Sequence, residues 1–346
     1  MQNIILSASD PGGANTLLPL IEQLSKEFKL HFILGGASRE LFTKAGIDFV
    51  DGDKLGEVEL QKIITDLHPD IFVAGSSFGY TIDKRILELV KGKTKTIYIL
   101  DFWSNYWQRF SSLKVKDFKY LPDVICVMDD FASKEMIKDG FVQEMIRVTG
   151  NPHFDSFIES ISPELREKNR ILFISQPYSD TENVATNFGY TEFDVLDDLL
   201  EILEDHNDYK LIIRPHPKEE QGKFNEVIKS RKNISLDDDT TDVRTSISRA
   251  DLIIGMNSMV LLQAGLAGKD VISYQPGLKD GTDVLVSNKM GMSRLVTDSE
   301  ELRQILGNYF TGSGVNIRNK ADLKGFSIIK NAGDNVIKLI KNYVKV

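Results

Sequence analysis

Short apolar runs recur along the whole chain, and within each run the apolar residues are consecutive rather than alternating with polar ones. The runs are Ile4–Leu6, His31–Leu34, Ile71–Ala74, Thr96–Leu100, Val124–Met128, Ile171–Ile174, Leu211–Ile213, Leu252–Ile254 and Val271–Tyr274. Strands have this pattern when helices cover both faces of their sheet. The nine runs therefore predict buried strands in sheets that are enclosed by helices.

Segments with a helical period lie between these runs. Leu17, Ile21 and Leu24, for example, are spaced by four and three residues and share one face of a helix. A repeated order of strand, helix, strand requires crossover connections and gives a mostly parallel sheet. We therefore predict an α/β protein with two such units, a hinge near Ser162-Pro163-Glu164, and a last helix over residues 328–343.

The composition agrees with two folded domains. The chain has 346 residues, of which 41% are hydrophobic and 27% charged, and this excludes a wholly disordered protein. One hydrophobic core rarely extends past about 250–300 residues. We expect Rossmann-like domains at 1–152 and 153–327 and a C-terminal helix at 328–346. The net charge of −9 argues against a protein that binds nucleic acid mainly through its phosphates.

The single cysteine, Cys126, excludes an intramolecular disulfide and a zinc cluster made of cysteines. Its apolar neighbours favour a buried strand position over a reactive thiol. No apolar run approaches the ~20 residues that span a bilayer, and the first residues lack the basic and apolar segments of a signal peptide. We expect a cytoplasmic protein, an expectation that allows peripheral contact with the inner face of a membrane.

The first candidate site is the loop after the first predicted strand. It contains Asp10, Gly12 and Gly13 and leads directly into a helix. Glycines let the backbone approach a ligand closely, and a helix start favours an anion. The alternative is an ordinary strand-to-helix turn that is capped by Ser or Asp. The Gly-x-Gly-x-x-Gly spacing of dinucleotide-binding proteins is absent.

The second candidate is the segment Arg214–Lys218 (Arg-Pro-His-Pro-Lys), which follows the predicted strand Leu211–Ile213. Two prolines stiffen the backbone around His216. A rigid histidine between Arg214 and Lys218 suits a phosphate or a nucleotide. A turn with a solvated histidine is the alternative.

The third candidate lies between the predicted strand Leu252–Ile254 and a predicted helix over 260–267. Asn257 or Ser258, which precede Met259, can cap this helix. The dipole and free N–H groups of the helix favour an anion, and a diphosphate is the natural occupant. Capping alone would also explain these residue types.

The fourth candidate is the aromatic segment Asp101–Phe110, which contains both tryptophans. Trp103, Tyr106 and Trp107 follow a helical spacing. They form either a stripe that faces the core or a platform that stacks on an acceptor. Asp101 follows a predicted strand, where a general base would be placed.

Other polar groups carry less weight. Asp237-Asp238-Asp239 could hold a divalent cation, but helix capping and a solvated loop are favoured. The chain lacks His-x-x-x-His and Glu-x-x-His pairs, so we expect no metal.

Three segments resemble those of the GT-B glycosyltransferase superfamily. Val148–Asp155 (VTGNPHFD) resembles the interdomain segment VTGNPxxD. Arg214–Lys218 resembles the RPHP segment of polymer transferases, among them the sialic acid, Kdo and glycerophosphate transferases. Gly255–Gly268 resembles the donor-site segment S…EA…G. The resemblance covers the C-terminal half and the hinge, and the N-terminal half mainly in its order of strands and helices.

The resemblance implies two Rossmann-like domains that face a cleft, with a nucleotide sugar held by the second domain and the last helix crossing back to the first. By position, Ser258 would contact the donor phosphate, and His216 and Lys218 would contact phosphate or nucleotide. Gln263 stands where many members have a glutamate that binds ribose hydroxyls. A neutral amide both donates and accepts, so the nucleotide preference is left open.

The leading hypothesis is a metal-independent glycosyltransferase, without a cofactor, that moves a sugar from a nucleotide donor to a polysaccharide or related glycan. The donor-binding candidates are Gly12, Gly13, Arg214, His216, Lys218, Asn257, Ser258, Met259 and Gln263. The catalytic candidates are Asp10, Asp101 and His216, with Trp103, Tyr106 and Trp107 for the acceptor.

Two other functions use the same layout. A nucleotide-sugar 2-epimerase or hydrolase is the first, although the segment Gly255–Gln263 lacks the paired carboxylates of the SGGxQEE segment of those epimerases. A nucleotide-sugar-binding protein without turnover is the second, and Gln263 is the feature that hints at it.

Overall fold

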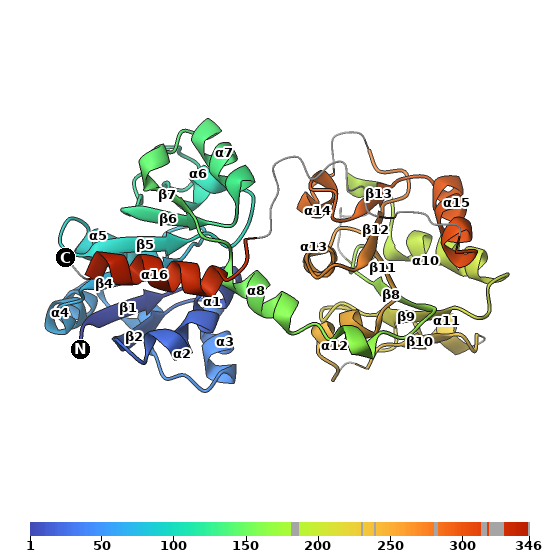
Figure 1. The fold of residues 1–346 in the computed structure, drawn as a ribbon, viewed down its shortest axis with the longest axis horizontal. Coiled ribbons are helices and arrows are strands. Elements are labelled where there is room, and N and C mark those ends of the chain that lie inside the picture. The colour runs from blue at the N-terminus through green and yellow to red at the C-terminus, as the bar shows by residue number, and fades with distance from the viewer. Residues whose placement is uncertain are drawn as a thin grey trace. The chain divides into compact units, whose positions relative to one another are not determined.

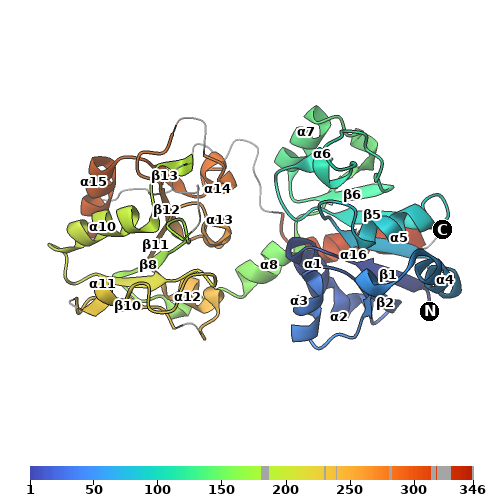
Figure 2. The same ribbon diagram turned by 180° about the vertical axis from the view of Figure 1, so that it is seen from behind.

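The computed structural model describes residues 1–180, 187–229, 231–238, 240–279, 283–312, 317 and 329–344. The chain forms two compact units. Unit 1 comprises Met1–Ser156 and Gly325–Val346, and unit 2 comprises Phe157–Lys324 (Figures 1 and 2). In the described residues no helix is long and apolar enough to cross a membrane.

Unit 1 is built on a parallel sheet of seven strands in the order β3-β2-β1-β4-β5-β6-β7. Its strands are β1 Asn3–Ser7, β2 Lys29–Leu34, β3 Val50–Asp51, β4 Ile71–Gly75, β5 Lys95–Ile99, β6 Val124–Val127 and β7 Ile146–Val148. Its helices are α1 Pro11–Leu17, α2 Ile21–Leu24, α3 Ser38–Lys44, α4 Glu57–Leu67, α5 Ile82–Val90, α6 Tyr106–Arg109, α7 Asp130–Lys138 and α16 Ala332–Val344. Helix α8, Pro152–Glu159, begins in unit 1 and contains the boundary between the units.

The C-terminal helix α16 packs on unit 1 beside β4, as the fold class predicts (Figure 1). Val336 and Ile340 are buried in the same core cluster as Ile4 and Leu17. Residues 328 and 345–346 of the predicted helix lie outside the described residues.

The segment Val148–Asp155 holds the start of this helix. Gly150 has φ +85° and lies against Ala332, and the Asp155 carboxylate accepts a hydrogen bond from the Ala332 N–H. The Asn335 amide donates to the Thr149 carbonyl at 3.0 Å. The motif therefore has a structural role in anchoring α16 on unit 1.

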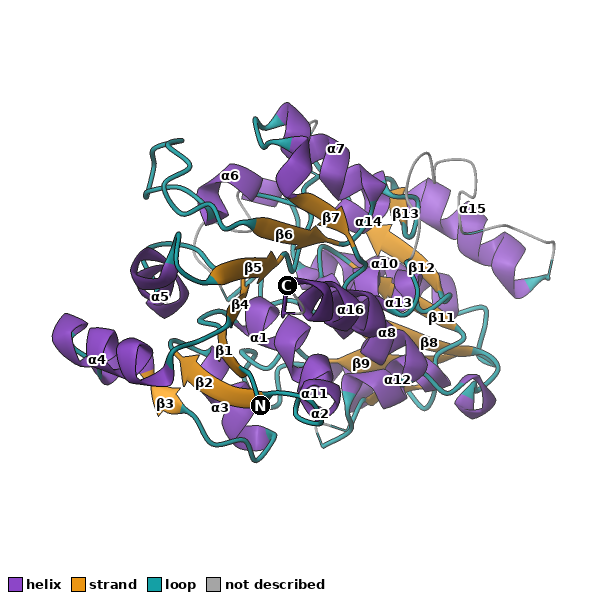
Figure 3. Ribbon diagram, turned by 60° about the vertical axis from the view of Figure 1, so that its left-hand side comes forward, coloured by secondary structure: helices purple, strands orange, loops and turns teal. Residues whose placement is uncertain are grey.

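Unit 2 is built on a parallel sheet of six strands in the order β10-β9-β8-β11-β12-β13. Figure 3 labels β9, β8, β11, β12 and β13 of this sheet. Its strands are β8 Arg170–Ile174, β9 Lys210–Arg214, β10 Ile234–Leu236, β11 Leu252–Gly255, β12 Asp270–Tyr274 and β13 Arg294–Val296. Its helices are α10 Glu192–Leu203, α11 Asn225–Lys229, α12 Val243–Arg249, α13 Met259–Leu266, α14 Val286–Lys289 and α15 Ser299–Phe310. Ile171 and Phe173 belong to one core cluster and Leu172 and Ile174 to another, so both faces of the sheet are covered.

All nine predicted strands are present, and the two parallel sheets confirm the predicted α/β class. The prediction missed β3, β7, β10 and β13, which are the four edge strands. They have only two or three residues each. An edge strand of this length contains too few buried residues to form an apolar run.

Candidate functional site

The carboxyl ends of three central strands in unit 2 bear the predicted donor site. Strand β8 lies between β9 and β11, and the three run parallel. The segment Arg214–Lys218 follows β9, and the turn before α13 follows β11. Both therefore open at the same edge of the sheet, on either side of the residues that follow β8. Ligands of open parallel sheets bind at this edge.

Gln176, which follows β8, connects the middle of this edge to the start of α13. Its side-chain Nε2 donates to the Asn257 carbonyl at 2.8 Å, and its Oε1 accepts from the Asn257 N–H at 2.8 Å. The amide thus pairs with the backbone of Asn257 as a neighbouring strand would. Gln176 was not among the predicted residues, because nothing in the sequence marks a glutamine that follows a strand.

Ser258 is the N-cap of α13, and its Oγ accepts from the Val260 N–H at 3.2 Å. Met259 is 41% exposed, and Gln263 lies partly buried one turn further along the helix. The cap uses one N–H of the first turn. The Leu261 N–H donates to the Ser258 carbonyl at 3.0 Å, and the N-terminal end of the helix favours an anion through its dipole.

His216 is partly buried, and both its backbone and its ring have partners. Its N–H donates to Oε2 of Glu219 at 2.6 Å, and its ring Nδ1 accepts from the Lys218 N–H at 3.2 Å. Burial lowers the pKa of His216 below 6.5; nearby Lys218 adds to this effect and Glu219 opposes it. With Nδ1 as an acceptor, the neutral ring has its proton on Nε2 and presents a hydrogen-bond donor.

Arg214 has a structural role, unlike its predicted one in phosphate binding. Its Nη1 donates to Asp237 at 2.6 Å and to Ser246 at 3.0 Å, and its Nη2 donates to the Thr241 carbonyl at 3.0 Å. The Asp237 side chain is only 5% exposed and needs a cation beside it. Arg214 therefore connects β9 to the segment that follows β10.

For Asp237 alone, this pairing corrects the interpretation of Asp237-Asp238-Asp239 as a capping, solvated loop. Asp237 is buried and paired with Arg214, whereas Asp238 accepts hydrogen bonds from Thr240. Residue 239 lies outside the described residues. Lys218, by contrast, is exposed, as a phosphate ligand should be.

A buried ionic cluster that no sequence pattern predicts lies behind His216. Lys223 makes ion pairs with Asp180 at 2.8 Å, with Glu219 at 3.1 Å, and with Glu192. The side chains of Glu192 and Glu219 are fully buried, and that of Lys223 is 8% exposed. The three carboxylates have oxygens within 4.8 Å of one another, as metal ligands can have, and the Lys223 ammonium pairs with all three.

The first predicted loop lies at the carboxyl edge of the sheet in unit 1. The Asp10 carboxylate accepts from the Phe78 N–H at 3.1 Å. A Cβ on Gly12 would meet Asp101, and a Cβ on Gly13 would lie 3.1 Å from the backbone of Gly75. The two glycines thus permit close packing within unit 1, a reason that requires no ligand.

Asp101, the second candidate base, is held by Arg109. Oδ1 of Asp101 accepts from Nη1 of Arg109 at 2.5 Å and from the Ser76 hydroxyl at 2.9 Å. Arg109 is 4% exposed and also lies over the Phe78 ring at 4.6 Å. The pair leaves Asp101 less available as a base than Asp10. Arg109 lies within the aromatic segment, eight residues after its partner Asp101, and no sequence pattern predicts that the two pair.

Two buried charged residues at the start of α5 lie at the same carboxyl edge of the sheet in unit 1. Asp83 accepts from the hydroxyls of Ser9 at 3.1 Å and Ser77 at 2.7 Å. Lys84 donates to the carbonyls of Ser77 and Gly79, and burial lowers its pKa. These bonds fix the loop after β4, which contains Phe78. No sequence pattern marks either charge.

The aromatic segment differs from the predicted helical platform. Only Tyr106–Arg109 is helical, because Asn105 has a left-handed φ of +55°. Trp103 is buried, stacks on Phe154 at 5.3 Å, and donates from Nε1 to Asp129 at 2.7 Å. Tyr106 is also buried, and Trp107 is partly exposed. Trp103 and Tyr106 therefore offer no open ring face to an acceptor.

The predicted residues thus form two groups. Asp10, Gly12 and Asp101 come together in unit 1, and His216 and Ser258 lie at one edge of unit 2.

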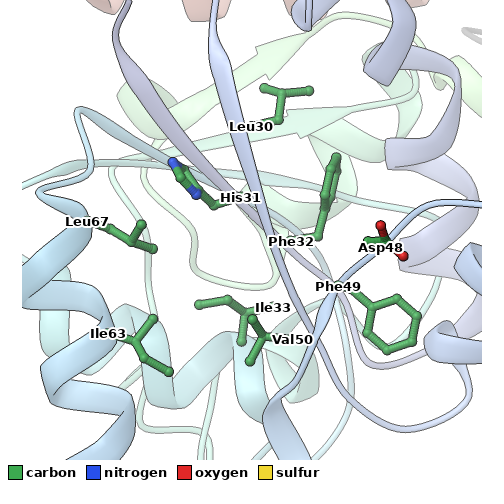
Figure 4. A pocket seen from close by; sticks show the side chains of 9 residues that line it. All are labelled: Leu30, His31, Phe32, Ile33, Asp48, Phe49, Val50, Ile63 and Leu67. Atoms are coloured by element: carbon green, nitrogen blue, oxygen red, sulfur yellow. The ribbon is translucent and has the colours of Figure 1, made fainter.

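A separate apolar pocket of about 400 Å³ in unit 1 contains none of the predicted residues (Figure 4). It is lined by Leu30, His31, Phe32, Ile33, Asp48, Phe49, Val50, Ile63 and Leu67.

The model of the alpha-2,8-polysialyltransferase family matches residues 130–269. This match includes both His216 and Ser258 and covers less than half of the chain. A comparison with curated protein sequences finds no match.

Several solved structures have a similar fold. A putative UDP-N-acetylglucosamine 2-epimerase from Listeria monocytogenes is 16% identical with a TM-score of 0.69, over 100% of this chain and 97% of that one. The Neisseria meningitidis UDP-N-acetylglucosamine 2-epimerase is 16% identical with a TM-score of 0.69, over 99% and 100%. MurG from Acinetobacter baumannii is 13% identical with a TM-score of 0.61, over 99% and 100%. The chain has the GT-B fold, which confirms the predicted resemblance to that superfamily.

Proposed function

We propose that the protein is a glycosyltransferase that moves a sugar from a nucleotide-activated donor to a glycan acceptor. The observation that carries this proposal is the shared edge in unit 2, where the His216 segment and the start of α13 flank the residues after β8. The polysialyltransferase model matches the part of the chain that contains both. The UDP-N-acetylglucosamine bound to the Neisseria protein of similar fold supports a nucleotide sugar as ligand.

In this proposal the donor phosphate lies between Nε2–H of His216 and the N-terminal end of α13, with Lys218 beside it. Negative charge grows on that phosphate as the sugar leaves. Fixed donors that point at developing charge stabilise the transition state without reorganising. A helix start and a lysine supply positive potential, so a metal is not required for this step.

The acceptor hydroxyl must lose a proton as it attacks, and we assign Asp10 as the base. Its carboxylate has one side-chain hydrogen bond within the described residues, from the Phe78 N–H. Oδ1 of Asp101 already accepts from Arg109 and Ser76. An oxygen without a strong donor beside it is the better proton acceptor. Asp101 and Arg109 then shape the loop around the acceptor.

The family match supports one class of donor. A polysialyltransferase adds sialic acid, so we propose a nucleotide-activated sialic acid or a related acidic sugar as donor. Sialic acid is activated as its CMP conjugate, whereas the similar structures are of proteins that bind UDP sugars. A melting-temperature panel with CMP, CDP, UDP, GDP and their sugar conjugates separates these cases, because a ligand of the folded state raises its melting temperature. We expect CMP to give the largest shift.

The binding residues are tested by His216→Ala and Ser258→Ala. Hydrogen bonds to charged groups contribute about 1.5–3 kcal/mol, so each change should weaken nucleotide binding roughly 10-fold or more. Glu220→Gln alters an exposed neighbour of the His216 segment, and Asp298→Ala removes the N-cap of α15, so both serve as controls. Unchanged binding in both test variants would refute the donor-site assignment.

A nucleotide-sugar 2-epimerase or hydrolase is the second candidate, since two of the similar structures are of such epimerases. The first five residues of α13, Met259–Gln263, contain no carboxylate, which argues against it. Incubation with nucleotide sugars and no acceptor decides between the two. Rapid epimerisation or hydrolysis would favour this candidate, and nucleotide release that depends on an added glycan would favour transfer over both this candidate and simple binding.

A further inference from the structure

The ionic cluster behind His216 brings several charged side chains of unit 2 together. Three carboxylates, Asp180, Glu192 and Glu219, surround a single ammonium, that of Lys223. Two of these carboxylates are fully buried. Buried charges cost several kcal/mol each unless they are paired and hydrogen-bonded. Here Lys223 pairs with all three carboxylates, and the contacts of Glu219 with the segments around it indicate a role in the site.

We propose that Glu219, held in place by Lys223, is a positioning residue that sets His216 in the donor site. This inference rests on the proposed function. Oε2 of Glu219 accepts the His216 N–H at 2.6 Å, and Oε1 accepts the Ser175 hydroxyl at 2.8 Å. One carboxylate therefore joins the segment after β9 to the segment after β8.

The connection continues from there to α13. Ser175 precedes Gln176, whose amide pairs with the N–H and carbonyl of Asn257, next to the cap Ser258. The path from Glu219 to the start of α13 thus consists of hydrogen bonds and one peptide unit. It fixes the two phosphate-binding elements relative to each other, which a preorganised site requires.

Lys223 keeps the Glu219 carboxylate in place. Its ammonium is 3.1 Å from Oε1 of Glu219, and it lies 5.4 and 5.8 Å from the ring centres of Phe193 and Phe224. Without this charge, the three carboxylates would repel one another, and Glu219 would turn away from His216. Lys223 thus has the place of a structural cation, and its role in the site is indirect.

Hydrogen exchange tests the positioning itself, in the protein without ligand. In Glu219→Ala we expect the His216 amide to exchange roughly tenfold faster, because a bond to a charged acceptor contributes about 1.5–3 kcal/mol. Glu219→Gln retains one carbonyl acceptor and should give a smaller change. Glu220→Gln, at an exposed neighbour, should give none. Equal exchange in Glu219→Ala and the wild type would overturn the inference.

Nucleotide affinity tests the link to the donor site, with CMP and UDP as probes. We expect Glu219→Ala to weaken the binding of the better probe roughly tenfold and Glu220→Gln to leave it unchanged. A wild-type protein that binds neither probe nor their sugar conjugates would refute the proposed function. A wild type that binds, together with a Glu219→Ala variant that binds equally well, would overturn the positioning role alone.

Lys223→Ala offers a readout that general destabilisation would not produce. It leaves three carboxylates with oxygens within 4.8 Å of one another, a spacing that Ca²⁺ with its 2.3–2.6 Å bonds can bridge. Millimolar Ca²⁺ should restore slow exchange of the His216 amide in this variant and leave the wild type unchanged. Failure to restore it in a folded variant would overturn the role of Lys223. If Lys223→Ala does not fold, Glu219→Ala and Glu219→Gln still decide the role of Glu219.

Discussion

The carboxylate of Asp101 lies so close to Gly12 that a Cβ on that glycine would come within 1.9 Å of its Oδ2. Gly12 belongs to helix α1, and Asp101 follows β5. Only a glycine allows the Asp101 side chain to approach the backbone of residue 12 this closely. In this position Asp101 pairs with Arg109.

Gly12→Ala should therefore destabilise unit 1 and displace Asp101 from Arg109. Forcing an extra methyl group into a packed contact costs about 1–3 kcal/mol. Gly307→Ala is the matched control, because Gly307 also lies in a helix but has nothing within 4 Å of its Cβ position. This control should be neutral or stabilising by up to about 1 kcal/mol. Urea denaturation measures both, and equal effects would contradict the close contact.

Arg214→Ala should reduce the stability of the fold more than it reduces nucleotide affinity. It leaves the buried Asp237 carboxylate without its closest cation, and removing one partner of a buried ion pair costs about 3–5 kcal/mol. Arg303→Ala breaks a pair with Glu201 in which both side chains are more than 40% exposed, and it should cost less than about 1 kcal/mol. The free energy of unfolding distinguishes them. A stable Arg214→Ala protein that fails to bind nucleotide would restore the predicted phosphate-binding role.

Gly150→Ala should release helix α16 from unit 1. Gly150 has φ +85°, and a Cβ there would be 2.6 Å from Cβ of Ala332 and 2.9 Å from the Ile329 carbonyl oxygen. Gly46 has a similar φ of +69° but open space around it, so Gly46→Ala shows the backbone strain alone. We expect at least about 1 kcal/mol more destabilisation at position 150, together with faster hydrogen exchange in α16. Slow exchange throughout α16 would argue against the anchoring role.

His216 should titrate below 6.5 in the folded protein, because burial disfavours its protonated form. Below pH 6.5 the unfolded chain then binds a proton at this position before the folded one does. This histidine therefore makes stability fall as the pH drops from 6.5 through its lowered pKa. The pKa of His31 is also lowered, so the effect is taken as the difference between the wild type and His216→Gln.

Proton NMR of the imidazoles gives the midpoint for His216 directly. Protonation also places a proton on Nδ1, which now accepts from the Lys218 N–H, so the Lys218 amide signal should follow the same midpoint. A midpoint at or above 6.5 would contradict the buried, neutral donor that we assign.

The order of strands and helices could be predicted from the sequence because local pattern determines it. Runs such as Ile71–Ala74 and Leu252–Ile254 are apolar throughout, since both faces of each central strand are buried. The edge strands escaped prediction because their few residues are partly solvated: Val50 is 40% exposed and Val148 is 37% exposed.

The sequence by itself determined the two parallel sheets and the places of His216 and Ser258. Each of these residues follows a predicted strand, and the carboxyl ends of parallel strands lie at the same edge of a sheet. Only the tertiary structure decided which charges pair. Arg214 pairs with Asp237, Arg109 pairs with Asp101, and Lys223 pairs with Asp180, which lies 43 positions earlier in the sequence. The order of the strands brings these partners together, and a carboxylate that is buried away from water is stable only beside a cation. No periodic pattern in the sequence predicts these pairs.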